Sequence, residues 1–473
     1  MKNYFIIISM LLILIQGCGA VGPDFVPPEV NTPANFRFAD KDARAVEDLK
    51  WWEMFNDPVL YQLVVSALEN NRDLKIALSR IEEARAAFGF TRADQYPGVD
   101  IQAGGSIGNF SGARSATTNS TVYISPMLQW ELDLWGKFKR SSAAAQAQIL
   151  ASEYGVRAVE IRLISDVASA YYLLLDYHQR LEISKETYDS RMKSLDIIQQ
   201  RFDKGIIPEI DLNQAQIQKE IAQGAIPTYE RMIAKTEHVL ALLLGQLPSA
   251  LKTHAPIKDQ SIPPYVPSVL PSDLLERRPE IQQSLALLHV QNEEIGVAVA
   301  QRFPAISLSA GLGLASSELS NITNQGGIWT GSAGLLGPLF DYNKAKHRVE
   351  IEEEQTRQAL FTYENTVLKA FAEVEDALVE VNTYGREKAA AGRKVAAAEN
   401  AADLSFERYD KGVSSYLEVL DSERTLFSVR LEFSQINQLF LGAYVKLYKA
   451  LGGGWVLPDE ARAGEKAGAA PQN

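Results

Sequence analysis

Two long stretches without proline limit what this chain can fold into more than any other feature. Residues 136–202 and 343–409 each have 67 residues and consist mostly of good helix formers. At about 1.5 Å per residue, a continuous helix of this length would extend for about 100 Å. Such a helix cannot fold back inside a compact domain. The sequence therefore predicts an elongated and mainly helical protein.

A short turn signal follows each long stretch. Lys204-Gly205 ends the first and Lys411-Gly412 ends the second, and a helical pattern then continues to about Gly245 and Leu451. Long helices joined by short turns form antiparallel hairpins. We expect Gly205 and Gly412 to supply the positive φ that such turns require.

The two halves of the chain are similar in sequence. Arg201-Phe202-Asp203-Lys204-Gly205 is matched by Arg408-Tyr409-Asp410-Lys411-Gly412, at an offset of 207 residues. Tyr96-Pro97 matches Phe303-Pro304 at the same offset, and Asp133 and Asp341 differ by 208. Several matches in one register indicate an internal tandem repeat of about 207 residues.

Residues with an alternating pattern precede each long helical stretch. In the first repeat, residues 99–103 and 121–125 alternate with period two, and residues 306–310 and 328–340 repeat the scheme. A polar stretch separates the two members of each pair, which is typical of a β-hairpin with a long loop. Strands of about 10 residues are long enough to cross a bilayer when tilted.

The predicted organisation of the chain follows from these patterns. It comprises a signal peptide (1–17), an extended segment (18–57), a first repeat (58–247, with its β-hairpin at 98–133), a proline-rich linker (248–271), a second repeat (272–452, with its β-hairpin at 305–340) and a C-terminal tail (453–473).

The N-terminus has the pattern of an export signal. Lys2 precedes an apolar run from Tyr4 to Ile15, which is too short to span a membrane as a helix. Cys18 follows after Gln16 and Gly17 and is the one cysteine of the 473 residues, so no intramolecular disulfide is possible. Ile15-Gln16-Gly17-Cys18 resembles a bacterial lipoprotein box. We therefore predict lipid attachment at Cys18.

Composition and motifs argue against nucleic-acid binding and catalysis. The net charge of -12 opposes binding to phosphates, which requires concentrated Lys and Arg. The five histidines show no HExxH spacing, and a single cysteine cannot form a thiolate zinc site. The sequence has neither a P-loop nor a nucleophile elbow. It predicts no catalytic, cofactor-binding or metal residue, and no enzyme.

Four strands in one chain leave two open sheet edges. Inside a bilayer, each unpaired backbone group would cost several kcal/mol. If these strands lie in a membrane, several chains must therefore contribute strands to one closed ring. The helices would continue that ring as a hollow cylinder, which is a duct. The alternative is a soluble protein with a four-stranded sheet and helical arms.

Several motifs, taken in order, resemble one family. They are Cys18-Gly19-Ala20-Val21-Gly22-Pro23-Asp24-Phe25, Trp51-Trp52-Glu53-Met54-Phe55-Asn56-Asp57-Pro58, Glu131-Leu132-Asp133-Leu134-Trp135-Gly136, Leu270-Pro271-Ser272-Asp273-Leu274-Leu275 with Arg277-Arg278-Pro279, Gly337-Pro338-Leu339-Phe340-Asp341, and Arg408-Tyr409 through Asp421. The chain resembles the lipoprotein branch of the TolC-like outer membrane factors. Members of this branch are the outer-membrane channels of efflux pumps of the resistance-nodulation-division class.

This resemblance implies a mixed fold, a function and a set of partners. It implies a homotrimer whose strands form a twelve-stranded transmembrane β-barrel in outer-membrane lipid, continued by a long α-helical barrel in the periplasm. The channel would passively export drugs or other small molecules. Its partners would be a periplasmic adaptor and an inner-membrane pump, and it would need no cofactor and bind no nucleic acid. The alternatives are a channel for type I protein secretion, a coiled-coil structural lipoprotein and a periplasmic enzyme.

The resemblance also implies a gating link between Asp211 and Tyr409. These residues lie next to the two repeated turns, which would form the periplasmic tip where the adaptor docks. Ser414 stands where the family prototype has a basic gate residue, which implies a weaker or differently built link. The alternative is an exposed aspartate and a tyrosine that only packs.

Glu418 and Asp421 are predicted to form the channel constriction. They lie three residues apart on a helix and therefore share a face. In a trimer they would form stacked acidic rings, which attract cations and repel anions. By resemblance they match the family's acidic constriction. The alternative is a charged pair on a solvated helix face.

Overall fold

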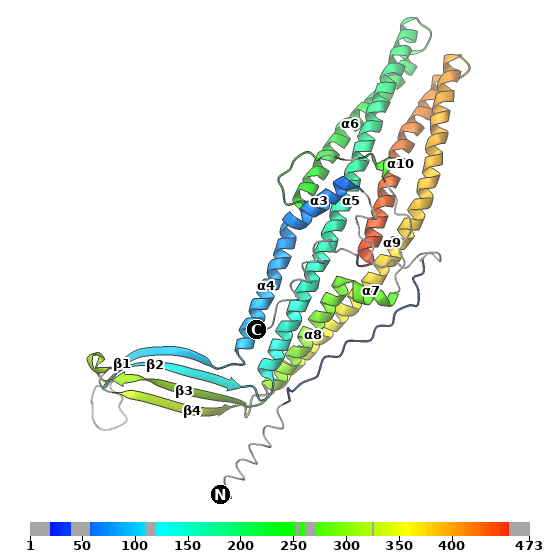
Figure 1. Cartoon of the computed structure of the whole chain (residues 1–473). Coiled ribbons are helices and arrows are strands. Elements are labelled where there is room, and N and C mark those ends of the chain that lie inside the picture. Colours follow the sequence, from blue (N-terminus) through cyan, green and yellow to red (C-terminus); the bar gives the residue numbers. More distant parts are fainter. Residues whose placement is uncertain are drawn as a thin grey trace. The chain divides into compact units, whose positions relative to one another are not determined.

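The computed structural model of the chain describes residues 19–38, 57–108, 119–251, 253, 255–260, 271–323 and 326–453 (Figure 1). The predicted signal peptide, Cys18, Trp51-Trp52 and most of the C-terminal tail lie outside the described residues. The chain forms two compact units, each built from three separate segments. The first unit comprises Met1–Val30, Leu78–Tyr154 and Gln282–Thr366, and the second comprises Asn31–Ala77, Gly155–Ile281 and Val367–Asn473.

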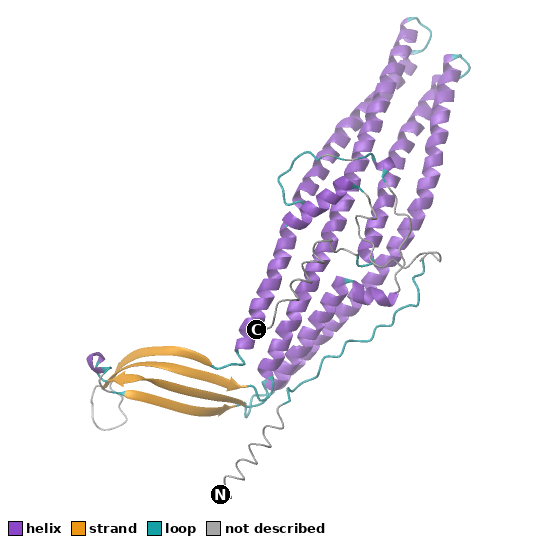
Figure 2. Cartoon of the chain, viewed as in Figure 1, coloured by secondary structure: helices purple, strands orange, loops and turns teal. Residues whose placement is uncertain are grey.

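The described chain is mostly helical, with a single group of strands (Figure 2). Its elements in chain order are α3 (Pro58–Asn70), α4 (Arg72–Ala93), β1 (Gly98–Gly108), β2 (Asn119–Leu132), α5 (Lys137–Asp203), α6 (Glu209–Leu243), the 3-10 turn η1 (Ile257–Asp259), α7 (Pro271–Arg277), α8 (Pro279–Ala300), β3 (Ala305–Ser316), the 3-10 turn η2 (Leu319–Asn321), β4 (Gly327–Leu336), α9 (Lys344–Asp410) and α10 (Tyr416–Ala450).

The long helices of the two repeats are equal in length. Helices α5 and α9 each have 67 residues, and α6 and α10 each have 35. Each long helix begins and ends one residue later than the sequence pattern predicts. Helix α6 includes Pro227 and continues through it. The offset of 207 residues seen in the sequence therefore also separates the corresponding helices.

The four strands of the first unit form one antiparallel sheet in the order β1-β2-β3-β4. The hairpins β1–β2 and β3–β4 are joined by pairing between β2 and β3, where Trp130 lies opposite Leu308. Within the described chain, β1 and β4 each have one edge without a partner strand. The N–H and C=O groups along these two edges remain available for pairing.

The two faces of the sheet differ in polarity because side chains alternate along each strand. One face carries apolar side chains across all four strands: Val99, Ile101, Ile124, Leu128, Leu308, Leu312 and Trp329. The neighbouring positions are mostly polar: Asp100, Gln102, Ser125, Gln129, Ser309 and Ser332. Ile101 is 75% exposed and Trp329 is 78% exposed, so the apolar face is not covered within this chain.

The helix predicted from Pro58 to Ala93 is divided at Asn71. The backbone of Asn71 has ψ of 135°, which is not helical, and its side-chain oxygen accepts a hydrogen bond from the N–H of Leu74 (3.0 Å). Its side-chain nitrogen donates to the carbonyl of Leu243 at the end of α6 (2.9 Å). Asn71 therefore ends α3, caps α4 and attaches the α3–α4 junction to α6.

Strand β4 is shorter than the predicted segment 328–340, because it ends at Leu336. Gly337 and Pro338 follow, and proline has no N–H to continue a strand ladder. The side chain of Asp341 then accepts a hydrogen bond from the N–H of Ala345 (2.8 Å) and caps α9. Asp133 caps α5 in the same way, through the N–H of Lys139 (2.8 Å).

The interior of the second unit is built around α5. Tyr171, Tyr172 and Leu174 of this helix are fully buried. The hydroxyl of Tyr171 donates to Asp57 (2.8 Å), whose other oxygen caps the first turn of α3 through the N–H of Leu60 (3.0 Å). The carboxylate of Asp57 therefore both caps α3 and binds the buried tyrosine of α5. None of the described helices is long and apolar enough to cross a membrane.

Candidate functional site

The two repeated turns lie in the second unit and have the same geometry. Gly205 has φ of +71° and Gly412 has φ of +73°. The N–H of Ile206 donates to the carbonyl of Arg201 (3.0 Å), and the N–H of Val413 donates to the carbonyl of Arg408 (2.8 Å). This pattern of hydrogen bonds closes a helix with a left-handed residue, which glycine adopts without strain.

A hydrophobic cluster next to these turns joins the two helical hairpins. Its buried members come from all four long helices: Ile198, Leu212, Ala215, Tyr409, Tyr416, Val419 and Leu420. The rings of Tyr409 and Tyr416 lie 5.2 Å apart at an angle of 49°. Burial of these side chains stabilises the contact between hairpin α5–α6 and hairpin α9–α10.

Asp211 and Tyr409, the predicted gating link, both lie at this cluster. Asp211 is in the first turn of α6, beside the buried Leu212, and burial raises the pKa of its carboxyl. Tyr409 is 9% exposed, and its buried hydroxyl has no hydrogen-bond partner among the described residues. The described structure has no hydrogen bond between the two side chains. Their gating link stays a prediction.

Glu418 and Asp421 lie on the exposed face of α10, and the buried Val419 and Leu420 lie between them in sequence. Glu418 forms an ion pair with Arg408 of α9 (Nε to Oε1, 3.0 Å). Asp421 is exposed and has no ion pair in the described part of the chain. The two carboxylates therefore differ in charge environment, although they share one helix face.

Sequence reasoning did not identify a role for the first residue of the repeated motif. Arg408 pairs with Glu418, and Arg201 binds Asp410 (2.7 Å) while its guanidinium lies 4.9 Å from the ring centre of Tyr409. Both arginines thus connect helix α9 with another long helix. The repetition of Arg at the same position in both turns was the available signal.

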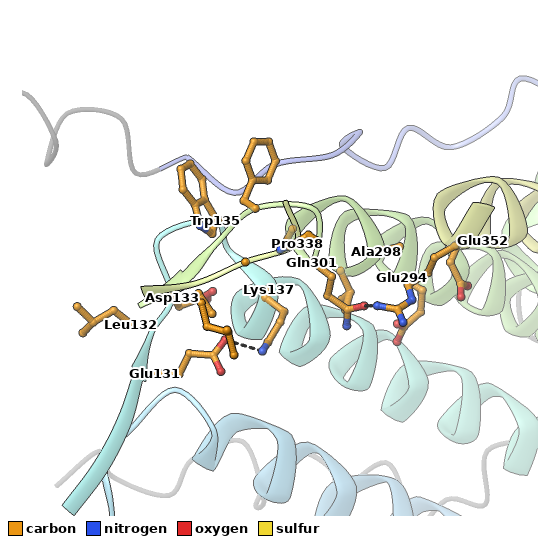
Figure 3. Close-up of a pocket in the computed structure, with 17 residues that line it drawn as sticks. Glu131, Leu132, Asp133, Trp135, Lys137, Glu294, Ala298, Gln301, Pro338 and Glu352 are labelled. Carbon is orange, nitrogen blue, oxygen red and sulfur yellow. Dashed lines mark hydrogen bonds and ion pairs between the residues drawn. The ribbon is translucent and has the colours of Figure 1, made fainter. Parts of the chain in front are cut away.

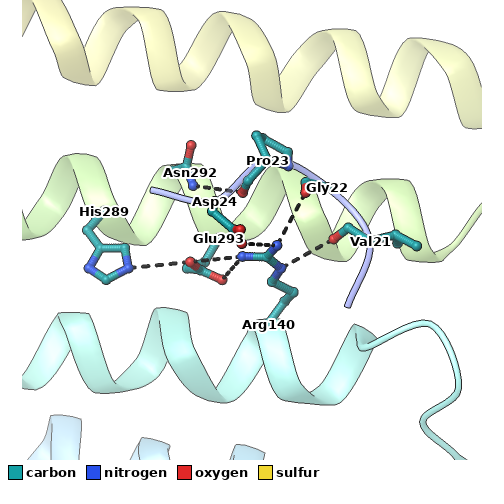
Figure 4. A network of polar contacts seen from close by, with 8 residues as sticks. All are labelled: Val21, Gly22, Pro23, Asp24, Arg140, His289, Asn292 and Glu293. Atoms are coloured by element: carbon teal, nitrogen blue, oxygen red, sulfur yellow. Dashed lines mark hydrogen bonds and ion pairs between the residues drawn. The ribbon is translucent and has the colours of Figure 1, made fainter. Parts of the chain in front are cut away.

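A network of polar contacts around Arg140 holds the N-terminal segment in place in the first unit (Figure 4). Arg140 of α5 donates to the carbonyls of Val21 (3.2 Å) and Gly22 (3.3 Å) and to Asp24 (2.9 Å). Its third nitrogen binds both oxygens of Glu293 of α8 (3.1 and 3.2 Å). Arg140 and Glu293 are both buried, so one guanidinium attaches residues 21–24 to two helices.

The first unit also has a cavity of about 860 Å3, lined by the ends of the strands and the adjoining turns of α5, α8 and α9 (Figure 3). Lys137 pairs with Glu131 (2.6 Å), and Arg348 donates to Gln301. Glu294 is half-buried in this lining. Burial raises the pKa of its carboxyl, and the negative charge of Glu352 raises it further.

The described residues include no group of three or more His, Cys, Asp or Glu side chains arranged to hold a metal ion. The polar groups at the turns and in the cavity are instead paired charges, helix caps and single carboxylates. Such groups can hold helices together and set the field along a surface, which is the chemistry of a gate or a pore lining.

The fold is that of outer-membrane channels. The structure is similar to the solved outer-membrane channel OprN, with a TM-score of 0.86 and 28% sequence identity. The similarity covers 92% of this chain and 99% of OprN.

The family follows from the sequence comparisons. The model of the outer membrane efflux protein family matches residues 63–246 and 270–453, so the chain belongs to this family. The solvent efflux pump outer membrane protein SrpC of Pseudomonas putida is 35% identical, over 94% of this chain and 97% of SrpC. The probable outer membrane lipoprotein SilC of Salmonella typhimurium is 30% identical, over 94% and 97%. The predicted family is confirmed, and the protein is an outer-membrane channel component of an efflux system.

The environment of Glu294 predicts how stability depends on pH. A carboxyl whose pKa is raised by folding destabilises the folded state once the pH exceeds its ordinary value of 4.5. At pH 7, Glu294→Gln should therefore increase thermal stability, by less than about 1 kcal/mol. The gain should disappear below about pH 4, where both states are protonated. Thermal unfolding in detergent, followed by circular dichroism at both pH values, measures this.

Glu353→Gln is the matched control, because Glu353 is an exposed carboxylate next to Glu352 in sequence. It should leave the unfolding temperature unchanged at both pH values. A loss of stability in Glu294→Gln at pH 7 would contradict the destabilising effect of burial and of the Glu352 charge on this carboxylate.

Proposed function

We propose that three copies of this chain form a passive exit duct through the outer membrane. Their strands close a twelve-stranded barrel, and their long helices continue it into the periplasm. Drugs or other small molecules reach the duct from an inner-membrane pump of the resistance-nodulation-division class through a periplasmic adaptor. Energy comes from the pump, since the channel itself only opens and closes.

The sheet carries this proposal. It has two open edges and one exposed apolar face within a single chain. In hydrocarbon, the edge groups must pair, and strands from neighbouring copies satisfy them if the sheet closes on itself. The apolar face then contacts lipid, and the polar face with Gln102, Ser309 and Ser332 lines the water-filled lumen. Three copies suffice to close the proposed barrel, because four strands from each copy give twelve strands.

The contact between the hairpins near Gly205 and Gly412 is the proposed gate. The buried hydroxyl of Tyr409 lacks an acceptor in the described chain, and leaving such a donor unpaired costs about 1–3 kcal/mol. The carboxylate of Asp211 is the proposed acceptor in the closed state. Engagement of the tip by the adaptor and pump would separate these helices. Ser414, whose buried hydroxyl also lacks a partner in the described chain, supplies no basic group to strengthen the link.

The acidic face of α10 is the proposed constriction. Three copies of Asp421 and of Glu418 would form stacked rings on the pore axis and favour cations. Arg408 partly neutralises Glu418, whereas Asp421 is exposed without an ion pair in the described chain. Asp421 is therefore the larger contributor to selectivity.

Lipid attached at Cys18 would anchor each copy in the inner leaflet of the outer membrane after removal of residues 1–17. The neighbouring residues 21–24 are bound by Arg140, which would hold the anchored end against α5 and α8. The relative SrpC belongs to a solvent efflux pump, and this favours small-molecule efflux over type I protein secretion.

A pair of substitutions on opposite faces of β1 tests the barrel. Ile101→Arg puts a charge on the apolar face, which costs about 2–4 kcal/mol at the bilayer midplane. We expect a large loss of heat-resistant trimer in outer-membrane extracts. Gln102→Arg puts the same charge on the polar face and should retain the trimer. Equal yields for both variants would argue against lipid contact at Ile101.

The gate is tested by removing the proposed link. Asp211→Ala combined with Tyr409→Phe removes a hydrogen bond to a charged group, for which about 1.5–3 kcal/mol is typical. The open state should therefore gain roughly tenfold or more in population. Recordings of single channels in planar bilayers should show higher conductance or longer openings. Unchanged recordings would rule out this pair as the latch.

The constriction is tested with neutral isosteres. Glu418→Gln combined with Asp421→Asn should move the cation-to-anion permeability ratio toward one, because the rings lose their charge. Of the two single variants, Asp421→Asn should have the larger effect. Reversal potentials in a salt gradient measure the ratio. If both single variants and the double variant keep the original selectivity, the acidic ring lies elsewhere.

A further inference from the structure

A buried arginine lies where hairpin α5–α6 meets α10. Arg191 of α5 is 3% exposed, and one of its terminal nitrogens donates to the main-chain carbonyl of Gln218 in α6 (2.6 Å). Its guanidinium lies 5.0 Å from the ring centre of Phe427 in α10. Its Nε has no hydrogen-bond partner among the described residues. The guanidinium of Arg191 is therefore almost fully shielded from water, and only some of its N–H groups have hydrogen-bond acceptors.

A second arginine, from α10, lies at the side chain of the same glutamine. Gln218 is 1% exposed, and with its side-chain amide assigned so that the oxygen is the atom next to Arg424, that oxygen accepts from the Nε (2.6 Å) and Nη2 (2.9 Å) of Arg424. The main chain of Gln218 thus binds α5 and its side chain binds α10. One residue of α6 connects three helices.

The charges around Arg191 come from α10 as well. Burial lowers the pKa of Arg191, Glu423 opposes this effect, and the like charge of Arg424 lowers the pKa further. Burial raises the pKa of Glu423, while Arg191 lowers it. Arg191 and Glu423 therefore stabilise each other's charge across the contact between hairpins, in a place where both lose water.

The internal repeat shows that this group is present in only one of the two corresponding places. At the offset of 207 residues, Ala398 of α9 corresponds to Arg191, and it is a buried small side chain. Ile217 of α6 corresponds to Arg424. Apolar residues thus occupy the positions of both arginines in the other repeat. Buried charged groups are seldom retained for stability alone, because apolar replacements often stabilise as well or better.

We propose that Arg191, Gln218, Glu423, Arg424 and Phe427 form a second lock of the gate, in which Arg191 and Arg424 are positioning residues that hold α10 against hairpin α5–α6. This Gln218 lock rests on the proposed gated duct and lies seven residues along α6 from Asp211, or about two helical turns. It restrains α10 farther from the turns than the link between Asp211 and Tyr409.

The chemistry of the lock suits a contact that must both hold and release. When closed, α10 supplies Glu423, the aromatic face of Phe427 and the Arg424 fork. When α10 moves away, these interactions are lost, but Arg191 regains water and moves away from the like charge of Arg424. The gain in hydration offsets part of the loss, so release of α10 costs less free energy than the lost contacts alone would require.

The test uses the full-length protein in planar bilayers. Arg191→Gln should raise the open probability of single channels about tenfold or more, because it removes the cation that lies over Phe427 and that the charge of Glu423 attracts. Arg191→Lys keeps the charge but loses the planar fork, so it should show an intermediate open probability. Arg162→Gln is the control, since Arg162 is exposed on the same helix and pairs with Asp166 of its own helix (3.6 Å). It should leave gating unchanged.

The coupling between the two sides of the contact gives the sharpest outcome. Glu423→Gln should also raise open probability, and the double variant with Arg191→Gln should show less than the product of the two effects. Independent effects of the two substitutions would overturn the charge pairing.

Gating and folding are separated by measuring oligomer mass and unfolding temperature on the same samples. If Arg191→Gln lowers the unfolding temperature but keeps the original open probability, Arg191 only packs and the lock is refuted while the duct stands. Arg424 is exposed, so Arg424→Gln provides a folded variant, and unchanged gating in it would also refute the lock. Absence of any channel in the unmodified protein would instead overturn the proposed duct.

Discussion

The unbroken backbone hydrogen bonding of α5 and α9 sets the positions of all the groups near the turns. Each helix has 67 residues and ends in a left-handed glycine, Gly205 or Gly412. Because the lengths are equal, both turns end beside one hydrophobic cluster that includes Tyr409 and Tyr416. One inserted residue in either helix would rotate its end by about 100° and advance it by about 1.5 Å. The arginines of the repeated motif would then miss their carboxylates.

Much of the fold is encoded in local patterns that a sequence displays directly. Helical continuity, the two turn glycines and the alternating strands all depend on neighbours within a few residues. The structure differs from the predicted elements where contacts with residues distant in sequence determine the end of a helix or strand. Asn71 ends a helix because it caps α4 and also binds the carbonyl of Leu243, which is 172 residues away in sequence. The end of β4 depends on Pro338, whose lack of an N–H the alternating pattern did not take into account.

The candidate site was less predictable than the fold, since its charges pair between helices that are distant in sequence. Asp211, Tyr409, Glu418 and Asp421 could be identified only through resemblance to a family. The partners of these residues, such as Arg408 for Glu418, came from the structure. Arg191 is an extreme case, because a lone arginine in a polar helical segment predicts an exposed side chain. Its burial follows from α6 and α10 packing on either side of it.

Polar contacts of this kind determine which arrangements of helices are possible, while apolar contacts determine how strongly they hold. The cluster with Leu212, Val419 and Leu420 stabilises any close approach of the hairpins, since apolar packing has little directional preference. A guanidinium fork on the single amide oxygen of Gln218 fits one register of α10 on α6. A shift by one helical turn keeps most of the apolar contact but leaves that amide unpaired. The hairpins therefore have few intermediate positions, and a change at the turns is expected to move α10 between two discrete arrangements.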